Sequence, residues 1–261
     1  MRKNIDWKRT FIWLILLVAV FIMAVSIHQL WDVCQMYKQG DQAYEEITDR
    51  VRQIDEVTLY LEAPQKAARP SVDIPSLAID FEALKAINKD AIGWLYCPDT
   101  VIDYPVMRAD DYNWYLRHLP DGTYNANGSL FLDYNCKPDF SDRLSTIYGH
   151  NMNSGSMFAS LTGYKEQAYF EEHPYMYLYT EQGNYRVELV YGCVVDANEW
   201  RERAFMFESN LSSLLSFAAY NTTFTSDRPY TDEDRFLVLS TCSYEFDDAR
   251  FIVMGVLRPG M

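Results

Sequence analysis

Residues 236–257 read FLVLSTCSYEFDDARFIVMGVL and are the most informative part of the chain. One apolar run ends at Cys242, a polar segment follows, and a second apolar run begins at Arg250. Two apolar runs joined by a short polar segment are typical of a β-hairpin. If its turn is centred near Phe246, Cys242 and Arg250 are cross-strand partners on one face, with Cβ atoms about 5 Å apart.

The predicted pair of thiol and guanidinium has a chemical consequence. A neighbouring arginine favours the thiolate, which is the nucleophilic form of cysteine and otherwise forms with a pKa of about 8.5. The planar set of donors on arginine can also hold a substrate carbonyl or its oxyanion. Cys242 is therefore a candidate nucleophile, and it needs a second group that transfers protons.

His150 is the candidate for this proton transfer. It follows the apolar run Leu144–Tyr148 and Gly149, and it precedes a polar loop that is expected to lead into a helix at Met157. A histidine at the end of a strand can face a cleft and serve as acid and base toward a cysteine elsewhere in the chain, although spacing alone does not decide this role. The remaining histidines are expected to be surface or capping residues: His28, His118 and His173.

The cysteine pattern gives no sign of a metal site or a disulfide framework. The chain has five cysteines and no CxxC pair, and an odd number leaves at least one thiol free. Cys193 lies in an alternating apolar stretch and is expected to be a buried structural residue. The acidic residues Asp133, Asp139 and Asp142 do not follow the ligand order of a calcium loop, so no metal ion and no organic cofactor are expected.

The segment Phe11–Ile27 contains no charged residue and follows four basic residues. This pattern predicts one membrane span with a cytoplasmic N-terminus and with the chain after about Trp31 outside. A cleaved signal peptide is the alternative, because Ala24-Val25-Ser26 resembles a cleavage site. The chain beyond Trp31 holds 19 of the 23 basic and 36 of the 37 acidic residues, so no nucleic-acid partner is expected.

Periodicity divides the outer part of the chain into a helical segment and a β-rich domain. Gln42–Leu61 has helical spacing, Ala63–Pro75 contains three prolines and reads as a linker, and Asp80 can cap a short helix. The long connection Asp196–Asp234 is expected to hold one helix, capped at Ser209 or Asn210, and to form a wall or lid of a site. Eight strand-like runs predict a closed barrel or a sandwich: Ile92–Cys97, Val101–Met107, Ser129–Asp133, Leu144–Tyr148, Tyr175–Thr180, Tyr185–Val195, Phe236–Thr241 and Phe251–Leu257.

Several motifs, in the same order along the chain, give it a resemblance to a known family. They are Ile92-Gly93-Trp94-Leu95, Ile102-Asp103-Tyr104-Pro105-Val106, Gly128-Ser129-Leu130-Phe131-Leu132-Asp133, Tyr148-Gly149-His150-Asn151-Met152, Gly155-Ser156-Met157-Phe158, and Leu239-Ser240-Thr241-Cys242 with Arg250 eight residues later. Together, from about Phe81 to Leu257, they resemble the class B sortases, cysteine transpeptidases of Gram-positive bacteria. The chain departs from the family pattern at Val238, where the family commonly has threonine.

The resemblance implies a mainly β fold, an eight-stranded sortase-type barrel with N-terminal helices and a helix in the long connection before the cysteine strand. Combined with the apolar segment, it implies four regions. They are a cytoplasmic tail at 1–9, a transmembrane signal-anchor at 10–31, an extracellular helical stalk and linker at 32–75, and the catalytic domain at 76–261.

The resemblance also implies a reaction. Cys242 would cleave a C-terminal sorting signal of a secreted protein after its threonine and form a thioacyl enzyme, with His150 as acid and base. Arg250 and the backbone N–H that follows Cys242 would hold the oxyanion. The acceptor would be an amine of a peptidoglycan precursor. Residues that would line the substrate groove are Ser240, Thr241 and Tyr244.

Three alternative functions remain open. A pilin-polymerising sortase would use a lysine as the acceptor, and a surface cysteine endopeptidase would use water. A non-enzymatic scaffold could keep the barrel without the chemistry, but the presence of Cys242, His150 and Arg250 argues against it.

Overall fold

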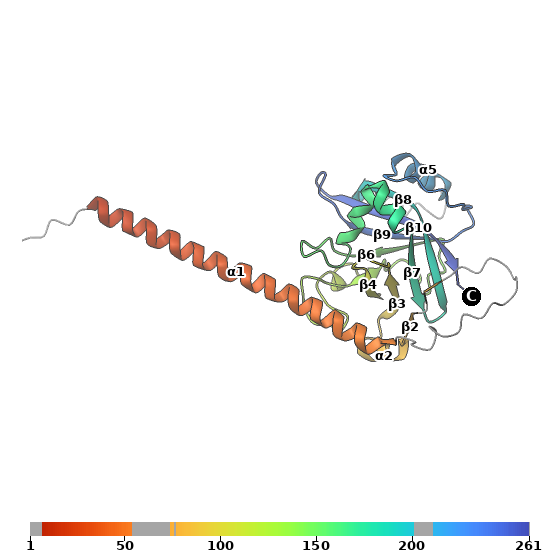
Figure 1. The fold of residues 1–261 in the computed structure, drawn as a ribbon, viewed down its shortest axis with the longest axis horizontal. Coiled ribbons are helices and arrows are strands. Elements are labelled where there is room, and N and C mark those ends of the chain that lie inside the picture. Colours follow the sequence, from red (N-terminus) through yellow and green to blue (C-terminus); the bar gives the residue numbers. More distant parts are fainter. Residues whose placement is uncertain (1–6, 54–73, 76, 201–210, 261) are drawn as a thin grey trace, which may run out of the picture.

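The computed structural model describes residues 7–53, 74–75, 77–200 and 211–260 (Figure 1). Its body is a closed barrel in which neighbouring strands follow the order β10-β8-β7-β3-β4-β5-β6-β9. The strands are β3 (Ala91–Tyr96), β4 (Asp103–Met107), β5 (Leu130–Leu132), β6 (Leu144–Tyr148), β7 (Tyr175–Thr180), β8 (Gly183–Asp196), β9 (Phe236–Cys242) and β10 (Ala249–Pro259). The predicted mainly β fold is confirmed, and the structure selects the barrel over the sandwich.

The two strands of the decisive hairpin are buried on both faces. Leu237 and Leu239 of β9 point into the barrel core, whereas Phe236 and Val238 pack outward in a second apolar cluster. Helix α5 (Leu211–Asn221) covers that outer face. Burial on both faces explains why β9 reads as a continuous apolar run, because alternation appears only where one face meets water.

The predicted register of this hairpin is confirmed. β9 and β10 pair antiparallel, and Arg250 lies opposite Cys242. Ser243 N donates to the Ala249 carbonyl over 2.9 Å, so the Cys242–Arg250 pair itself is of the non-hydrogen-bonded type. In such a pair the two side chains lie closest together.

The short helices follow the local signals with one exception. Helix α2 (Phe81–Ile87) is capped as predicted, because the Asp80 carboxylate accepts from Ala83 N over 2.8 Å. The helix expected at Met157 begins instead at Ala159, as the 3-10 helix η3 (Ala159–Lys165), because Met157 has a φ of 57° that no helix accommodates. Further short helices are η2 (Trp114–Leu116) and α3 (Gln167–Glu172), and the described residues 197–200 after β8 are also helical. The caps expected for α5 at Ser209 and Asn210 lie outside the described residues.

The N-terminal segment is one uninterrupted helix, α1 (Trp7–Val51), and not a span followed by a separate amphipathic helix. After it, β1 (Arg52–Gln53) pairs with β2 (Ala78–Ile79). The predicted helix end at Leu61 and most of the predicted linker lie outside the described residues. By length and composition α1 can cross a membrane, and Figure 1 shows its N-terminal part projecting away from the barrel.

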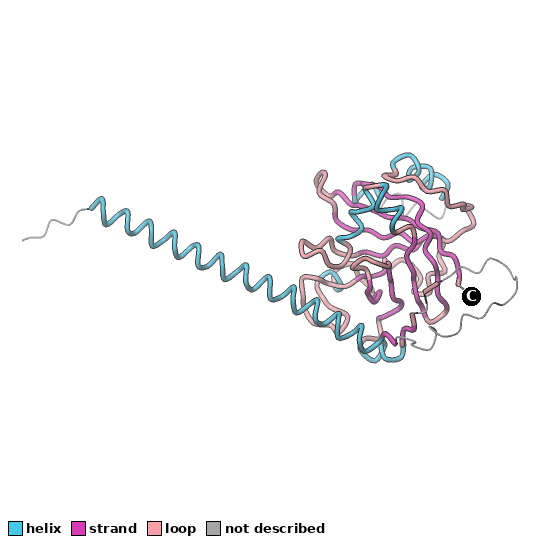
Figure 2. The backbone as a smooth tube through the Cα atoms, viewed as in Figure 1, coloured by secondary structure: helices cyan, strands magenta, loops and turns pink. Residues whose placement is uncertain are grey.

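The last turns of α1 belong to the packed body. Tyr44, Ile47 and Val51 are buried, and the Tyr44 hydroxyl donates to the Gly128 carbonyl over 2.5 Å. Figure 2 shows that the strands form the centre of the body, with the C-terminal end of α1 against it. This part of the helix therefore acts as a component of the domain and not as a free stalk.

We predict that Ile47→Ala destabilises the full-length chain by about 2–4 kcal/mol, because it leaves a cavity where the α1 side chain meets the domain. The measurement is urea unfolding in detergent. The exposed neighbour Glu46 provides the control, since Glu46→Ala removes no buried contact. Equal stability of the two variants would contradict the packing of α1 on the barrel.

Candidate active site

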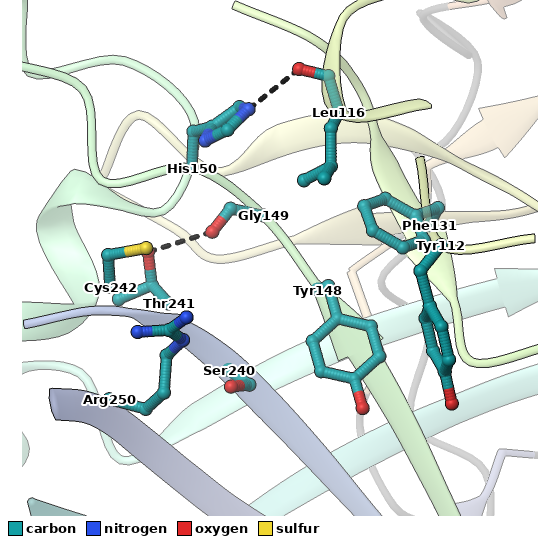
Figure 3. Close-up of a pocket in the computed structure, with 10 residues that line it drawn as sticks. All are labelled: Tyr112, Leu116, Phe131, Tyr148, Gly149, His150, Ser240, Thr241, Cys242 and Arg250. Carbon is teal, nitrogen blue, oxygen red and sulfur yellow. Dashed lines mark hydrogen bonds between the residues drawn. The ribbon is translucent and has the colours of Figure 1, made fainter. Parts of the chain in front are cut away.

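A pocket of about 270 Å³ lies where β5, β6, β9 and β10 meet two loops (Figure 3). It brings together the three residues predicted to be catalytic. The residues that line it are Tyr112, Leu116, Phe131, Tyr148, Gly149, His150, Ser240, Thr241, Cys242 and Arg250.

Cys242 ends β9, and its side chain shares one face of the hairpin with Arg250. Figure 3 shows the Cys242 side chain lying between the guanidinium of Arg250 and the ring of His150. Arg250 Nη1 donates to the Ala249 carbonyl over 2.9 Å, and this bond holds the guanidinium at the pocket. The arrangement places a cation and an acid–base group beside a half-buried thiol.

The backbone donor expected beside the oxyanion is engaged elsewhere. The N–H of Ser243, the residue after Cys242, donates to the Ala249 carbonyl and completes the hairpin. The expectation that this N–H is available to a substrate oxyanion is therefore wrong for this structure, because hairpin closure consumes the donor. Of the two groups proposed for this role, Arg250 is the one that faces the pocket.

His150 lies where β6 ends, after a glycine that the packing requires. A Cβ at Gly149 would lie 2.5 Å from the Leu130 side chain and 2.6 Å from that of Phe158. His150 Nε2 lies 2.7 Å from the Leu116 carbonyl oxygen. A carbonyl can only accept, so Nε2 carries the proton and Nδ1 is left for proton exchange.

The chain is similar in sequence to proteins named sortase B. It is 34% identical over 178 residues to sortase B of Listeria monocytogenes, an alignment that covers 67% of this chain and 72% of that protein. The chain belongs to the class B sortases. It is therefore a cysteine transpeptidase of the sortase type.

Solved sortase structures agree with this assignment, whereas no family model matches the chain. Sortase B of Clostridium perfringens is 28% identical, with a TM-score of 0.64 over 68% of this chain and 99% of that structure. A Streptococcus pyogenes class B sortase involved in pilus biogenesis is 29% identical, with a TM-score of 0.63 over 68% of this chain and 97% of that structure.

Of the three residues predicted to form the substrate groove of this sortase, two line the pocket and one does not. Ser240 and Thr241 line the pocket but are nearly buried, and the Thr241 hydroxyl donates to the Gly149 carbonyl over 2.8 Å. Tyr244 is not among the described residues that line the pocket, and its side chain is 75% exposed.

The far end of the pocket is an aromatic wall that the sequence motifs did not predict. Figure 3 shows Tyr112 and Tyr148 at the end away from Cys242. The Tyr148 hydroxyl donates to Asp133 over 2.8 Å, and the Tyr112 hydroxyl contacts the same carboxylate at 3.0 Å. Burial and the neighbouring Asp133 raise the pKa of Tyr148, so it remains a neutral donor.

Burial suppresses the ionisation of three thiols that lie outside the pocket. It raises the pKa of Cys97, raises that of Cys136 to about 11 and raises that of Cys193 to about 12. These three side chains therefore remain as thiols at neutral pH. Cys34 is exposed on α1 and lies outside the pocket.

The structure also places the remaining sequence candidates. His118 stacks on Trp114 with ring centroids 3.8 Å apart, and His173 lies beside Tyr169. His28 pairs with Asp32 on α1. Val238 is fully buried in the apolar cluster under α5, where a threonine hydroxyl would have apolar neighbours. Among the described residues of the long connection, none lines the pocket, so α5 acts as a cover of the barrel and not as a wall of the site.

Proposed function

We propose that this transpeptidase cleaves a C-terminal sorting signal after its threonine and joins the released carbonyl to a cell-wall amine. The observation that carries the proposal is the position of Cys242 between His150 and Arg250 in one pocket. The pocket continues past these groups along an apolar and aromatic surface, which suits an extended peptide.

In the proposed reaction His150 accepts the proton of the Cys242 thiol at Nδ1, and the resulting thiolate attacks the threonine carbonyl carbon. The guanidinium of Arg250 stabilises the negative charge that develops on the carbonyl oxygen. His150 protonates the departing amine as the carbon–nitrogen bond breaks, which leaves a thioester on Cys242. An incoming amine then loses a proton to His150 and displaces the thiolate, so that a new amide bond forms.

The proposed partners follow from the reaction and from α1. The donors are secreted proteins that bear a sorting signal, and the acceptor is an amine of a peptidoglycan precursor. We propose that residues 10–31 anchor the chain in the membrane, with residues 1–9 in the cytoplasm and the catalytic domain from 76 outside. The exposed apolar side chains from Phe11 to Val33 support the anchor.

A peptide library tests the function directly. The protein is incubated with fluorogenic sorting-signal peptides, and the products are analysed by mass spectrometry with and without added amines. A thioester adduct on Cys242, resolved by an amine, is the expected result. An adduct on another cysteine, or none with any peptide, would contradict the proposal.

The same experiment addresses a pilin-polymerising role, which the similarity to the Streptococcus pyogenes enzyme makes a specific alternative. A lysine side chain offered as a peptide would then be the preferred acceptor over a cell-wall amine. Release of the free acid in the presence of both amines would instead indicate a hydrolytic endopeptidase.

We predict that removing residues 1–31 leaves peptide cleavage within about twofold of the full chain in detergent, because none of the described residues 7–31 lines the pocket. Removal of residues 1–51 should instead prevent stable folding, because it deletes the buried side chains of Tyr44, Ile47 and Val51. The measurements are kcat/KM and thermal unfolding. A folded but inactive 32–261 chain would show that the anchor has a role in catalysis.

A further inference from the structure

Two segments that carry the reacting groups are joined by a side chain that the proposed reaction does not use. Lys165 ends η3, the first helix after the His150 loop. Its Nζ lies 3.0 Å from the hydroxyl of Ser243, the residue that follows Cys242. It also forms an ion pair with Glu245 in the β9–β10 turn.

The turn residues complete this arrangement among themselves. The Ser243 hydroxyl donates to the Glu245 carboxylate, so Lys165, Ser243 and Glu245 form a closed triangle of polar contacts. The Lys165 ammonium also lies 5.4 Å from the centroid of the Phe251 ring, next to Arg250 on β10. Lys165 therefore contacts both the turn that follows Cys242 and the strand β10 that carries Arg250.

A second contact joins the same two segments closer to the thiol. Asn151, the residue after His150, donates from Nδ2 to the Cys242 carbonyl over 3.0 Å. The segment from His150 to Lys165 is thus attached to the cysteine hairpin at its beginning and at its end. Between these attachments Phe158 N donates to the His150 carbonyl over 2.9 Å, which closes the loop on itself.

We propose that Lys165 is a positioning residue that clamps the β9–β10 turn to the histidine segment and so fixes Cys242 and Arg250 relative to His150. The proposal rests on the proposed function for its catalytic consequence. The turn has a need for such support: Asp248 adopts a left-handed φ of 60°, and the side chains of Tyr244 and Phe246 are exposed. Besides the clamp, the described contacts that hold this turn are those of its own hairpin, the Asn151 bond to the Cys242 carbonyl, and the bond from Ala197 N to the Asp248 carbonyl over 3.1 Å.

The carboxylate of the clamp stays ionised well below neutral pH. The Lys165 ammonium and the Ser243 hydroxyl hold the pKa of Glu245 at about 2, below its ordinary value of 4.5. A carboxylate with a lowered pKa loses its contribution only as the pH falls through that value. The Glu245 carboxylate of the clamp therefore stays charged near neutral pH.

The test compares Lys165→Met with Lys165→Arg and with a matched control, Lys85→Met. Lys85 forms a similar exposed ion pair with Glu181, away from the pocket, and loses the same charge when substituted. Lys165→Met should lower kcat about tenfold with KM changed by less than about threefold, because the reacting groups lose alignment while peptide contacts remain. Lys165→Arg should recover most of the rate, and Lys85→Met should behave as the wild type.

Hydrogen exchange of the folded protein supplies a readout that does not depend on catalysis. Faster exchange of the amides of Ser243 to Ala249 in Lys165→Met, with the remaining strands of the barrel unchanged, is the expected result. A global loss of protection, unchanged exchange in the turn, or full kcat in Lys165→Met would each overturn the clamp. If the wild type cleaves no peptide, the proposed function fails, and exchange alone decides whether Lys165 holds the turn.

Discussion

Cys242→Ala is expected to abolish both peptide cleavage and transfer and to leave the fold intact. The substitution removes the sulfur that would form the thioester, and no other thiol lines the pocket in the described part of the chain. Loss of a nucleophile removes the covalent route entirely, so the remaining rate should be at least about 10³-fold lower. The side chain is only half-buried, and its loss leaves no large cavity.

The measurements are peptide cleavage with an added amine and thermal unfolding of the same samples. Cys34→Ala and Cys136→Ala serve as controls, since one thiol is exposed on α1 and the other is only partly buried outside the pocket. Both should retain turnover close to that of the wild type. Full activity of Cys242→Ala would show that the nucleophile has been assigned to the wrong residue.

Arg250→Lys is expected to fold normally and to lose a factor of about 10² or more in kcat/KM, the scale observed when an oxyanion donor is removed. Arg250 lies directly opposite Cys242, and its Nη1 is already bound to the Ala249 carbonyl. The planar guanidinium can keep that bond and still present other N–H groups to the pocket. Lysine has a single ammonium and a shorter reach, so it cannot do both.

Arg258 on the same strand provides the matched control. It pairs with Glu188 and Asp234 at the opposite end of β10, away from the pocket. Arg258→Lys keeps the charge and should therefore leave kcat/KM near the wild-type value, whatever it does to the unfolding temperature. Near-native turnover of Arg250→Lys would show that the planar guanidinium is not required and that the oxyanion is held by other groups.

Much of the fold could be predicted because its signals are local. The apolar runs of β6 and β7 have the predicted bounds, and most of the other strands differ by one or two residues at an end. The pairing of Cys242 with Arg250 followed from the symmetry of one short hairpin, whose two partners are eight residues apart. The bounds of η3 were less predictable, because the backbone at Met157 is set by its tertiary neighbours.

By itself the sequence determined the strands, the hairpin register and the identity of the groups that could do chemistry. The spacing of apolar residues and the composition of turns are patterns of a few neighbouring residues. These patterns are sufficient to predict those features. Only the tertiary structure decided how the groups are oriented. The carbonyl that orients His150 belongs to Leu116, 34 residues away, and Asn151 reaches Cys242 across 91 residues. Lys165 reaches Ser243 across 78 residues. No local pattern encodes such contacts, because they exist only after the barrel closes and brings separate loops to the end of β9 that carries Cys242.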